Sequence, residues 1–142
     1  MSGKSDKFFL GKAYNLEKSV MKDDFIIYDP DDLTTHAVIT GMTGSGKTGL
    51  GVIMLEEAAL QRIPAIVIDP KGDLTNLLLH FPDLLPEDFK PWVDKDAARR
   101  DGISVEEAAE KTASIWKNGL ASYGLGKPQL EALSDAVEFA VY

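Results

Sequence analysis

The chain of 142 residues contains no cysteine, which excludes disulfide bonds and cysteine-ligated zinc. The same absence is compatible with a reducing compartment, and we expect a cytoplasmic location. No apolar run reaches the length needed to cross a bilayer, and residues 1–6 lack the apolar core of a signal peptide. We therefore expect no membrane partner.

Basic residues are also in short supply. The 15 lysines and arginines are outnumbered by 23 aspartates and glutamates, and the formal net charge is −8. A surface that binds nucleic acid over its whole extent needs clustered lysine and arginine, so the charge leaves room for DNA contact only through a local patch. The hydrophobic fraction of 44% and the charged fraction of 27% are ordinary for a soluble globular domain.

The chain does contain a complete phosphate-binding loop of the form G-x-x-x-x-G-K-[ST] at residues 41–48. Its glycines permit backbone angles that let consecutive N–H groups converge on one anion. Lys47 supplies a mobile positive charge for the β- and γ-phosphates, and Thr48 supplies a hydroxyl ligand for Mg²⁺. The motif predicts a nucleotide partner, with ATP and Mg²⁺ as cofactors, bound by Gly41, Thr43, Gly44, Ser45, Gly46, Lys47, Thr48 and Gly49.

The flanks of the loop fit its expected context. Residues 36–40 form a short apolar run typical of a core strand, and residues 49–60 show apolar side chains at helical spacing without proline. Residues 65–69 again have the pattern of a buried strand. Together they predict a parallel βαβ unit, and hence an α/β fold with the core of a phosphate-loop NTPase.

The rest of the chain predicts smaller elements on either side of this core. Residues 8–14 and 25–28 look like two short strands, which suggests an N-terminal strand pair or lid over residues 1–32 and a partial phosphate-loop ATPase domain over residues 33–142. The residues after Phe81 have a helical or irregular pattern, which predicts a helical C-terminal tail.

Two helices are expected in that tail. Ser104 to Glu107 has the form of a capping box in front of a helix that extends to Ala121. Pro128 suits the first turn of a last helix that extends through Phe139.

Asp69 ends the second predicted strand, and its role has two interpretations. In kinases and GTPases the strand after the phosphate loop carries an acidic Mg²⁺ ligand, which would make the chain a small phosphotransferase or GTPase-like switch. In ring-type ATPases the metal-side acid and a catalytic glutamate lie on a later strand. The sequence contains no Asn-Lys-x-Asp segment of the kind that recognises guanine, and this absence argues against a GTPase-like switch.

The residues around Asp69, taken together with the phosphate loop, resemble a known group of ATPases. Residues 43–48 together with Ile68-Asp69-Pro70-Lys71-Gly72-Asp73 resemble the HerA–FtsK superfamily of DNA-translocating and secretion ATPases, and especially HerA-like ATP-binding proteins of bacteria. The loop itself is shared by many ATPases, whereas the Asp-Pro-Lys-Gly-Asp segment is more specific. The resemblance covers most of residues 8–80 and more weakly the helical tail.

The resemblance implies an ATPase that hydrolyses ATP to drive a hexameric ring along DNA. By this resemblance residues 44–48 match the family's phosphate loop, and Asp69 matches its acidic residue at the end of the second strand. Because parallel strands share a carboxyl edge, we expect Asp69 near the loop, where it could orient water or Mg²⁺. The expected catalytic residues are therefore Lys47 and Asp69, and the expected metal ligands are Thr48 and Asp69. Family members are far longer, and their later strand with an aspartate–glutamate pair, their polar sensor and most of their DNA-facing pore have no counterpart here. We therefore expect a truncated fragment that binds nucleotide and hydrolyses it weakly. A third interpretation is a non-catalytic adaptor that keeps the loop as a structural anion nest.

Several residues have a structural alternative to a functional role. Asp69 could instead fix the turn that follows it, and we weigh the two roles equally. Asp73 is favoured as the cap of a short helix over residues 74–80. Arg99 and Arg100 could supply an arginine finger to a neighbouring subunit, but their mixed-charge run is more typical of a solvated face.

Overall fold

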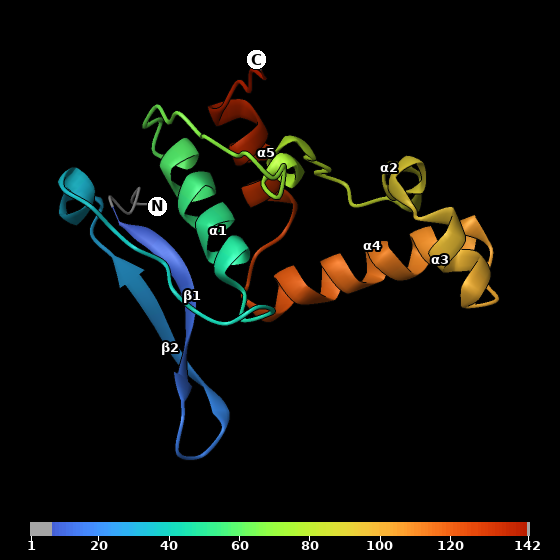
Figure 1. Cartoon of the computed structure of the whole chain (residues 1–142), viewed down its shortest axis with the longest axis horizontal. Coiled ribbons are helices and arrows are strands. Elements are labelled where there is room, and N and C mark those ends of the chain that lie inside the picture. The colour runs from blue at the N-terminus through green and yellow to red at the C-terminus, as the bar shows by residue number, and fades with distance from the viewer. Residues whose placement is uncertain (1–6, 142) are drawn as a thin grey trace. The chain divides into compact units, whose positions relative to one another are not determined.

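The computed structural model describes residues 7–141, without the side chain of Asn76, and it forms two compact units. The first unit extends to Leu79 and also includes the chain from Asp135 onward, and the second comprises His80–Ser134. Figure 1 shows the elements of both units. The sequence-based division at residue 32 stays a prediction.

The first unit begins with an antiparallel hairpin, as the sequence predicted. Strand β1, Phe8–Asn15, pairs with β2, Val20–Tyr28, so that Phe8 lies opposite Tyr28. Two irregularities of register interrupt the ladder, between Phe9 and Gly11 and again closer to the hairpin tip. Such bulges increase the local twist of a two-stranded ribbon.

Helix α1, Lys47–Leu60, packs against β1 and forms the small core of this unit. The side chain of Phe8 is only 2% exposed, and Ala59 is also buried. The Glu57 carboxylate of α1 accepts a hydrogen bond from the Phe9 backbone N–H at 3.0 Å. This bond joins the hairpin directly to the helix that follows the phosphate loop.

Short 3₁₀ helices complete the first unit. Helix η1, Pro30–Thr34, is capped by Asp29, which also forms an ion pair with Lys7 at 2.9 Å. Helix η2 spans Thr75–Leu78. The expected Asp73 cap is not observed, because the hydrogen bonds of the turn before η2 come from Asp69 and Thr75 instead.

The predicted parallel βαβ unit is not observed, and this part of the fold prediction was wrong. Within residues 7–141 the only sheet is the hairpin of β1 and β2. Residues 36–40 and 65–69 are irregular, and Ile66 and Ile68 are 96% and 87% exposed. A strand exists only through hydrogen bonds to a neighbouring strand, and these segments pair neither with each other nor with the hairpin. The chain is a mixed α/β protein.

The second unit is helical, which confirms the predicted helical tail. It contains α2 (Pro86–Phe89), the 3₁₀ helix η3 (Lys90–Trp92), α3 (Lys95–Arg100), α4 (Val105–Ser122) and most of α5 (Lys127–Ala136). The predicted last helix therefore ends three residues before Phe139. Buried side chains from α2, α4 and the preceding turn form the core, namely Leu84, Phe89, Ala109 and Ala113.

The start of α4 confirms the capping box. Glu107 N–H donates to the Ser104 hydroxyl at 3.1 Å, and the Ser104 backbone N–H donates to the Glu107 carboxylate at 2.7 Å. Two backbone donors that a helix cannot satisfy itself are thereby paired. Phe89 packs beneath α4 with its ring edge-on to Phe81, at a centroid distance of 5.1 Å.

Candidate functional site

The phosphate-binding loop has the backbone geometry that its glycines permit. Gly44 and Gly46 both adopt the left-handed region, with φ of 80° and 88°. Gly46 is the N-cap of α1, and no side chain caps this end of the helix. Within the described chain the N–H groups of residues 47–49 have no hydrogen-bond partner. They form the positive end of the helix dipole, where an anion is favoured.

Lys47 closes the loop on itself. Its Nζ donates to the Met42 carbonyl oxygen at 2.7 Å, and the Ser45 backbone N–H donates to the same oxygen at 3.2 Å. A Cβ on Gly41 would lie 2.4 Å from the Ser45 hydroxyl, so the loop also packs closely against its first glycine. Sequence reasoning missed the role of the Met42 carbonyl, because any residue can supply a backbone oxygen.

The loop is open to solvent. Residues 41–46, Thr48 and Gly49 are exposed, and Lys47 is partly exposed. The N–H groups, the Lys47 ammonium and the Thr48 hydroxyl are thus all accessible to a ligand from solution. The N–H groups and the ammonium can bind the negatively charged oxygens of a phosphate chain, and the hydroxyl oxygen can coordinate a hard cation.

Asp69 lies in a tight turn at the end of residues 63–69. Its Oδ1 accepts the Gly72 N–H at 3.0 Å, and its Oδ2 accepts the Leu74 N–H at 2.8 Å. The Leu74 N–H is the largest cause of a lowered pKa of the Asp69 carboxyl, and the N–H groups of Asp73, Gly72 and Lys71 also lower it. The structural alternative considered for Asp69 is therefore present in the molecule.

No hydrogen bond or ion pair among residues 7–141 joins Asp69 to the phosphate loop. Asp69 instead lines a hollow of about 620 Å³, together with Arg62 and Phe139 and with apolar residues near the end of α1. None of the residues that line this hollow belongs to the phosphate loop. The structure thus gathers Gly41 to Gly49 in one site and gives Asp69 partners of its own.

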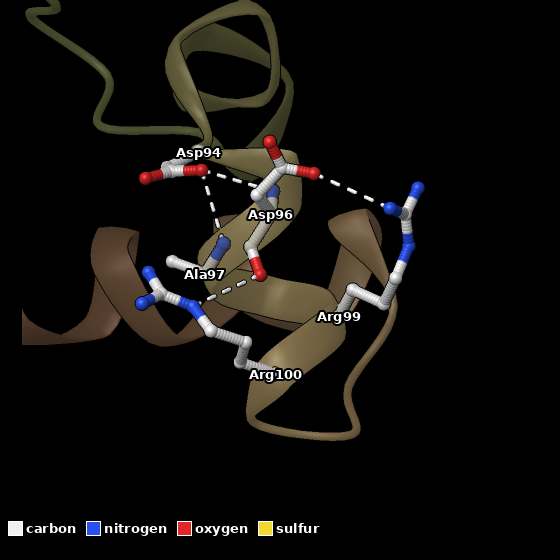
Figure 2. Close-up of polar contacts among 5 residues, drawn as sticks. All are labelled: Asp94, Asp96, Ala97, Arg99 and Arg100. Atoms are coloured by element: carbon white, nitrogen blue, oxygen red, sulfur yellow. Dashed lines mark hydrogen bonds and ion pairs between the residues drawn. The ribbon is translucent and has the colours of Figure 1, made fainter.

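The two arginines considered for an arginine finger belong to α3 (Figure 2). Asp94 caps this helix through the N–H groups of Asp96 and Ala97, at 2.9 and 3.0 Å. Arg99 forms an ion pair with Asp96 at 3.3 Å, in which both side chains are more than four-fifths exposed. Arg100 donates from Nε to the Asp96 carbonyl oxygen at 3.4 Å. These contacts fit the solvated mixed-charge face, and the finger stays a prediction.

Glu57 is a further residue whose role the sequence did not reveal. Burial raises the pKa of its carboxyl, partly offset by the hydrogen bond from Phe9 N–H. Burial also raises the pKa of the adjacent Glu56 carboxyl, and the negative charge of Glu57 adds to that effect. The signal available was a pair of acids on an otherwise apolar helix, which indicates that at least one of them has a partner.

Comparison with known proteins places this chain in a family. The model of the family described as "Helicase HerA, central domain" matches residues 20–118. This range covers well over half of the chain and includes both the phosphate loop and the Asp69 turn. The chain belongs to this family, and the resemblance to the HerA–FtsK superfamily is confirmed.

Neither a curated protein nor a solved structure matches the chain. Within the part of the chain that the structure describes, no helix is both long and apolar enough to cross a membrane. In the same residues, no group of three or more histidine, aspartate or glutamate side chains is placed to hold a metal ion.

Proposed function

We propose that this chain binds Mg·ATP at residues 41–49 as the nucleotide-binding part of a HerA-like ATPase. The observation that carries the proposal is the loop geometry: two left-handed glycines lead into a helix whose first N–H groups have no partner. An anion bound there would accept hydrogen bonds from these N–H groups without any rearrangement of the backbone. Membership in the HerA family supports ATP as the nucleotide.

The donor set fits both parts of the ligand. Backbone N–H groups at the start of α1 would hold the β-phosphate, and the Lys47 ammonium would hold the β- and γ-phosphate oxygens. Thr48 would give its hydroxyl oxygen to Mg²⁺, which prefers oxygen ligands and keeps several waters. At this position Mg²⁺ would supply positive charge that offsets the negative charge of the phosphate oxygens.

Lys47 has to exchange one partner for another when nucleotide binds. In the structure its Nζ donates to the Met42 carbonyl oxygen. An ammonium gains more from a charged phosphate oxygen than from a neutral carbonyl, so the exchange favours binding. As the lysine turns toward the phosphates, the Ser45 N–H still donates to the Met42 oxygen and preserves the shape of the loop.

We propose that hydrolysis by the chain itself is weak. Lys47 can stabilise charge on the γ-phosphate, but the Asp69 carboxylate is engaged by backbone N–H groups and α3 holds Arg99 in a local ion pair. An arginine finger contributes roughly 10³–10⁵ in rate, so turnover without one is slow. A hexameric ring, as the family suggests, would supply such a residue from a neighbouring subunit.

The test is calorimetric titration with ADP and ATP in the presence of Mg²⁺. We expect saturable binding by the wild-type chain and loss of most ATP affinity in Lys47→Ala, because the loop amides alone do not neutralise the γ-phosphate. Lys71→Ala is a matched control, since it removes an exposed lysine of the Asp69 turn. Equal affinity in the wild type and Lys47→Ala would refute the proposal.

The proposal of weak hydrolysis is tested by measuring phosphate release under saturating Mg·ATP, with and without DNA. Turnover on the order of 1 per second or faster is typical of a competent enzyme. Such a rate in the isolated chain would refute weak hydrolysis and would favour the phosphotransferase interpretation instead.

A further inference from the structure

The segment from Asp69 to Leu74 is organised around a carboxylate that the chain itself supplies. One oxygen of Asp69 accepts from Gly72 and the other accepts from Leu74, at 3.0 and 2.8 Å. The Gly72 N–H also points at the Asp69 carbonyl oxygen, 3.3 Å away. Both oxygens of the side chain are therefore used within six residues of sequence.

Gly72 makes this arrangement possible. Its φ is 74°, in the left-handed region, where a residue with a side chain is strained. A left-handed residue in a turn directs neighbouring N–H groups to the same side and creates a concave nest for an anion. In this turn the anion is the Asp69 carboxylate, and residues 69–74 contain both the nest and its occupant.

The other acid of the turn behaves differently. Asp73 is exposed, and its side chain makes no hydrogen bond within the described residues. The two aspartates are thus close in sequence and equal in charge, but only Asp69 holds the backbone. This contrast provides a built-in control.

The bonds of Asp69 oppose a role as metal ligand. To reach a metal, the carboxylate would have to turn away from Gly72 and Leu74. That would leave the Leu74 N–H unpaired and the Gly72 N–H with only its longer bond to the Asp69 carbonyl oxygen. The carboxylate would thereby lose the two charge-assisted bonds that fix its present orientation.

We infer that Asp69 is a positioning residue that anchors the 69–74 turn through its backbone N–H groups, and that it is not a ligand of Mg²⁺. Only the statement about Mg²⁺ rests on the proposed nucleotide site. The anchoring role stands on the geometry of the turn.

The experiment compares Asp69→Asn with Asp73→Asn in the full chain. Each removes one negative charge, but only the first weakens the turn, because an amide oxygen is a poorer acceptor than a carboxylate and its NH₂ group cannot accept. We expect Asp69→Asn to lower the thermal unfolding midpoint by roughly 3–8 °C and Asp73→Asn to change it by about 1 °C or less. Equal midpoints for the two variants would overturn the anchoring role.

The statement that Asp69 is not a Mg²⁺ ligand is tested by measuring ADP binding as a function of Mg²⁺ concentration in the same variants. We expect the Mg²⁺ concentration at half-maximal binding to stay within about twofold of wild type in Asp69→Asn, whereas Thr48→Ala should raise it about tenfold or more. A tenfold rise in Asp69→Asn would overturn the inference whatever its unfolding midpoint. If the wild type binds no nucleotide at all, the proposed function fails, while the unfolding comparison still tests the anchor.

A measurement on the wild type keeps the inference testable if Asp69→Asn does not fold. Amide hydrogen exchange at Gly72 and Leu74 should be slow in the free chain and remain slow after addition of Mg²⁺ and ADP. If Mg²⁺ drew the carboxylate to itself, the Leu74 amide would lose its acceptor and its exchange would accelerate, while the Gly72 amide would keep only its longer bond to the Asp69 carbonyl oxygen. Faster exchange at Leu74 after addition of Mg²⁺ and ADP would refute the anchor.

Discussion

Gly46→Ala tests whether the backbone angle of the phosphate loop, rather than its charge, controls nucleotide affinity. Gly46 has φ of 88°, and a Cβ built on it meets no heavy atom within 4 Å. Steric conflict with the surroundings therefore contributes nothing. What remains is the intrinsic cost of holding an L-residue in the left-handed region, about 1–2 kcal/mol.

Gly46 sets the direction of the first N–H groups of α1. In the free chain of the variant, the new alanine can relax to a right-handed angle, so the cost is incurred when the loop returns to the conformation that binds phosphate. A penalty of about 1–2 kcal/mol corresponds to roughly a 5–30-fold loss of affinity. Calorimetric titration with ADP and Mg²⁺ measures it directly. Charge, lysine and hydroxyl are all unchanged in this variant, so the loss isolates the backbone.

The control is Gly51→Ala, in the interior of α1. Its Cβ also meets no heavy atom within 4 Å, but its φ lies outside the left-handed region. Alanine in a helix interior is favoured over glycine by about 0.8–1 kcal/mol, so this variant should be more stable and should bind ADP as the wild type does. Equal losses of affinity in the two variants, or no loss in Gly46→Ala, would refute the reasoning.

Three further predictions concern stability. Ser104→Ala should lower the free energy of unfolding by about 1 kcal/mol, and an unchanged urea midpoint would contradict the capping role. Phe89→Ala should cost about 3–5 kcal/mol, because the ring is 7% exposed beneath α4; Trp116 fluorescence should then report a lower urea midpoint. Burial raises the pKa of the Glu57 carboxyl above its ordinary 4.5 in the folded chain. The protonated carboxyl therefore stabilises the folded state at pH below 4.5, and this stabilisation is lost as the pH rises through the folded-state pKa. Glu57→Gln should weaken the pH dependence of the unfolding midpoint across that window. An unchanged pH dependence would contradict the role assigned to Glu57.

The elements that the sequence predicted correctly are those whose hydrogen bonds close within a few residues. The α4 helix satisfies its own backbone, and Ser104 and Glu107 satisfy its first donors. The hairpin of β1 and β2 pairs two neighbouring segments across a short tip. Local sequence contains enough information for such elements, so their existence was predictable. The bounds of the strands and of the last helix shifted, and α4 ends one residue beyond its predicted end.

The strands predicted around the phosphate loop show the opposite case. Residues 36–40 and 65–69 have the composition of core strands, but composition specifies an environment and does not provide it. A parallel strand needs partners on its edges and cover on its faces. Val38 and Ile66 have neither in this structure, at 83% and 96% exposed. Apolar runs therefore predicted a preference for burial and pairing that the described residues do not fulfil.

The candidate site was predictable to the extent that its chemistry belongs to the backbone. Glycines at fixed spacing before Lys47 imply left-handed angles, and the structure has them at Gly44 and Gly46. The partner of a side chain is a different kind of information. The carboxylate of Asp69 can face a metal or turn back to amides three and five residues ahead, and the identity of the residue is the same in both cases. The choice depends on Gly72, whose left-handed angle brings those amides within reach. Gly72→Ala should therefore reproduce the lowered unfolding midpoint of Asp69→Asn while leaving the charge of the turn intact. If this variant unfolds at the wild-type temperature, the nest does not hold the carboxylate, and Asp69 is again a candidate for the metal.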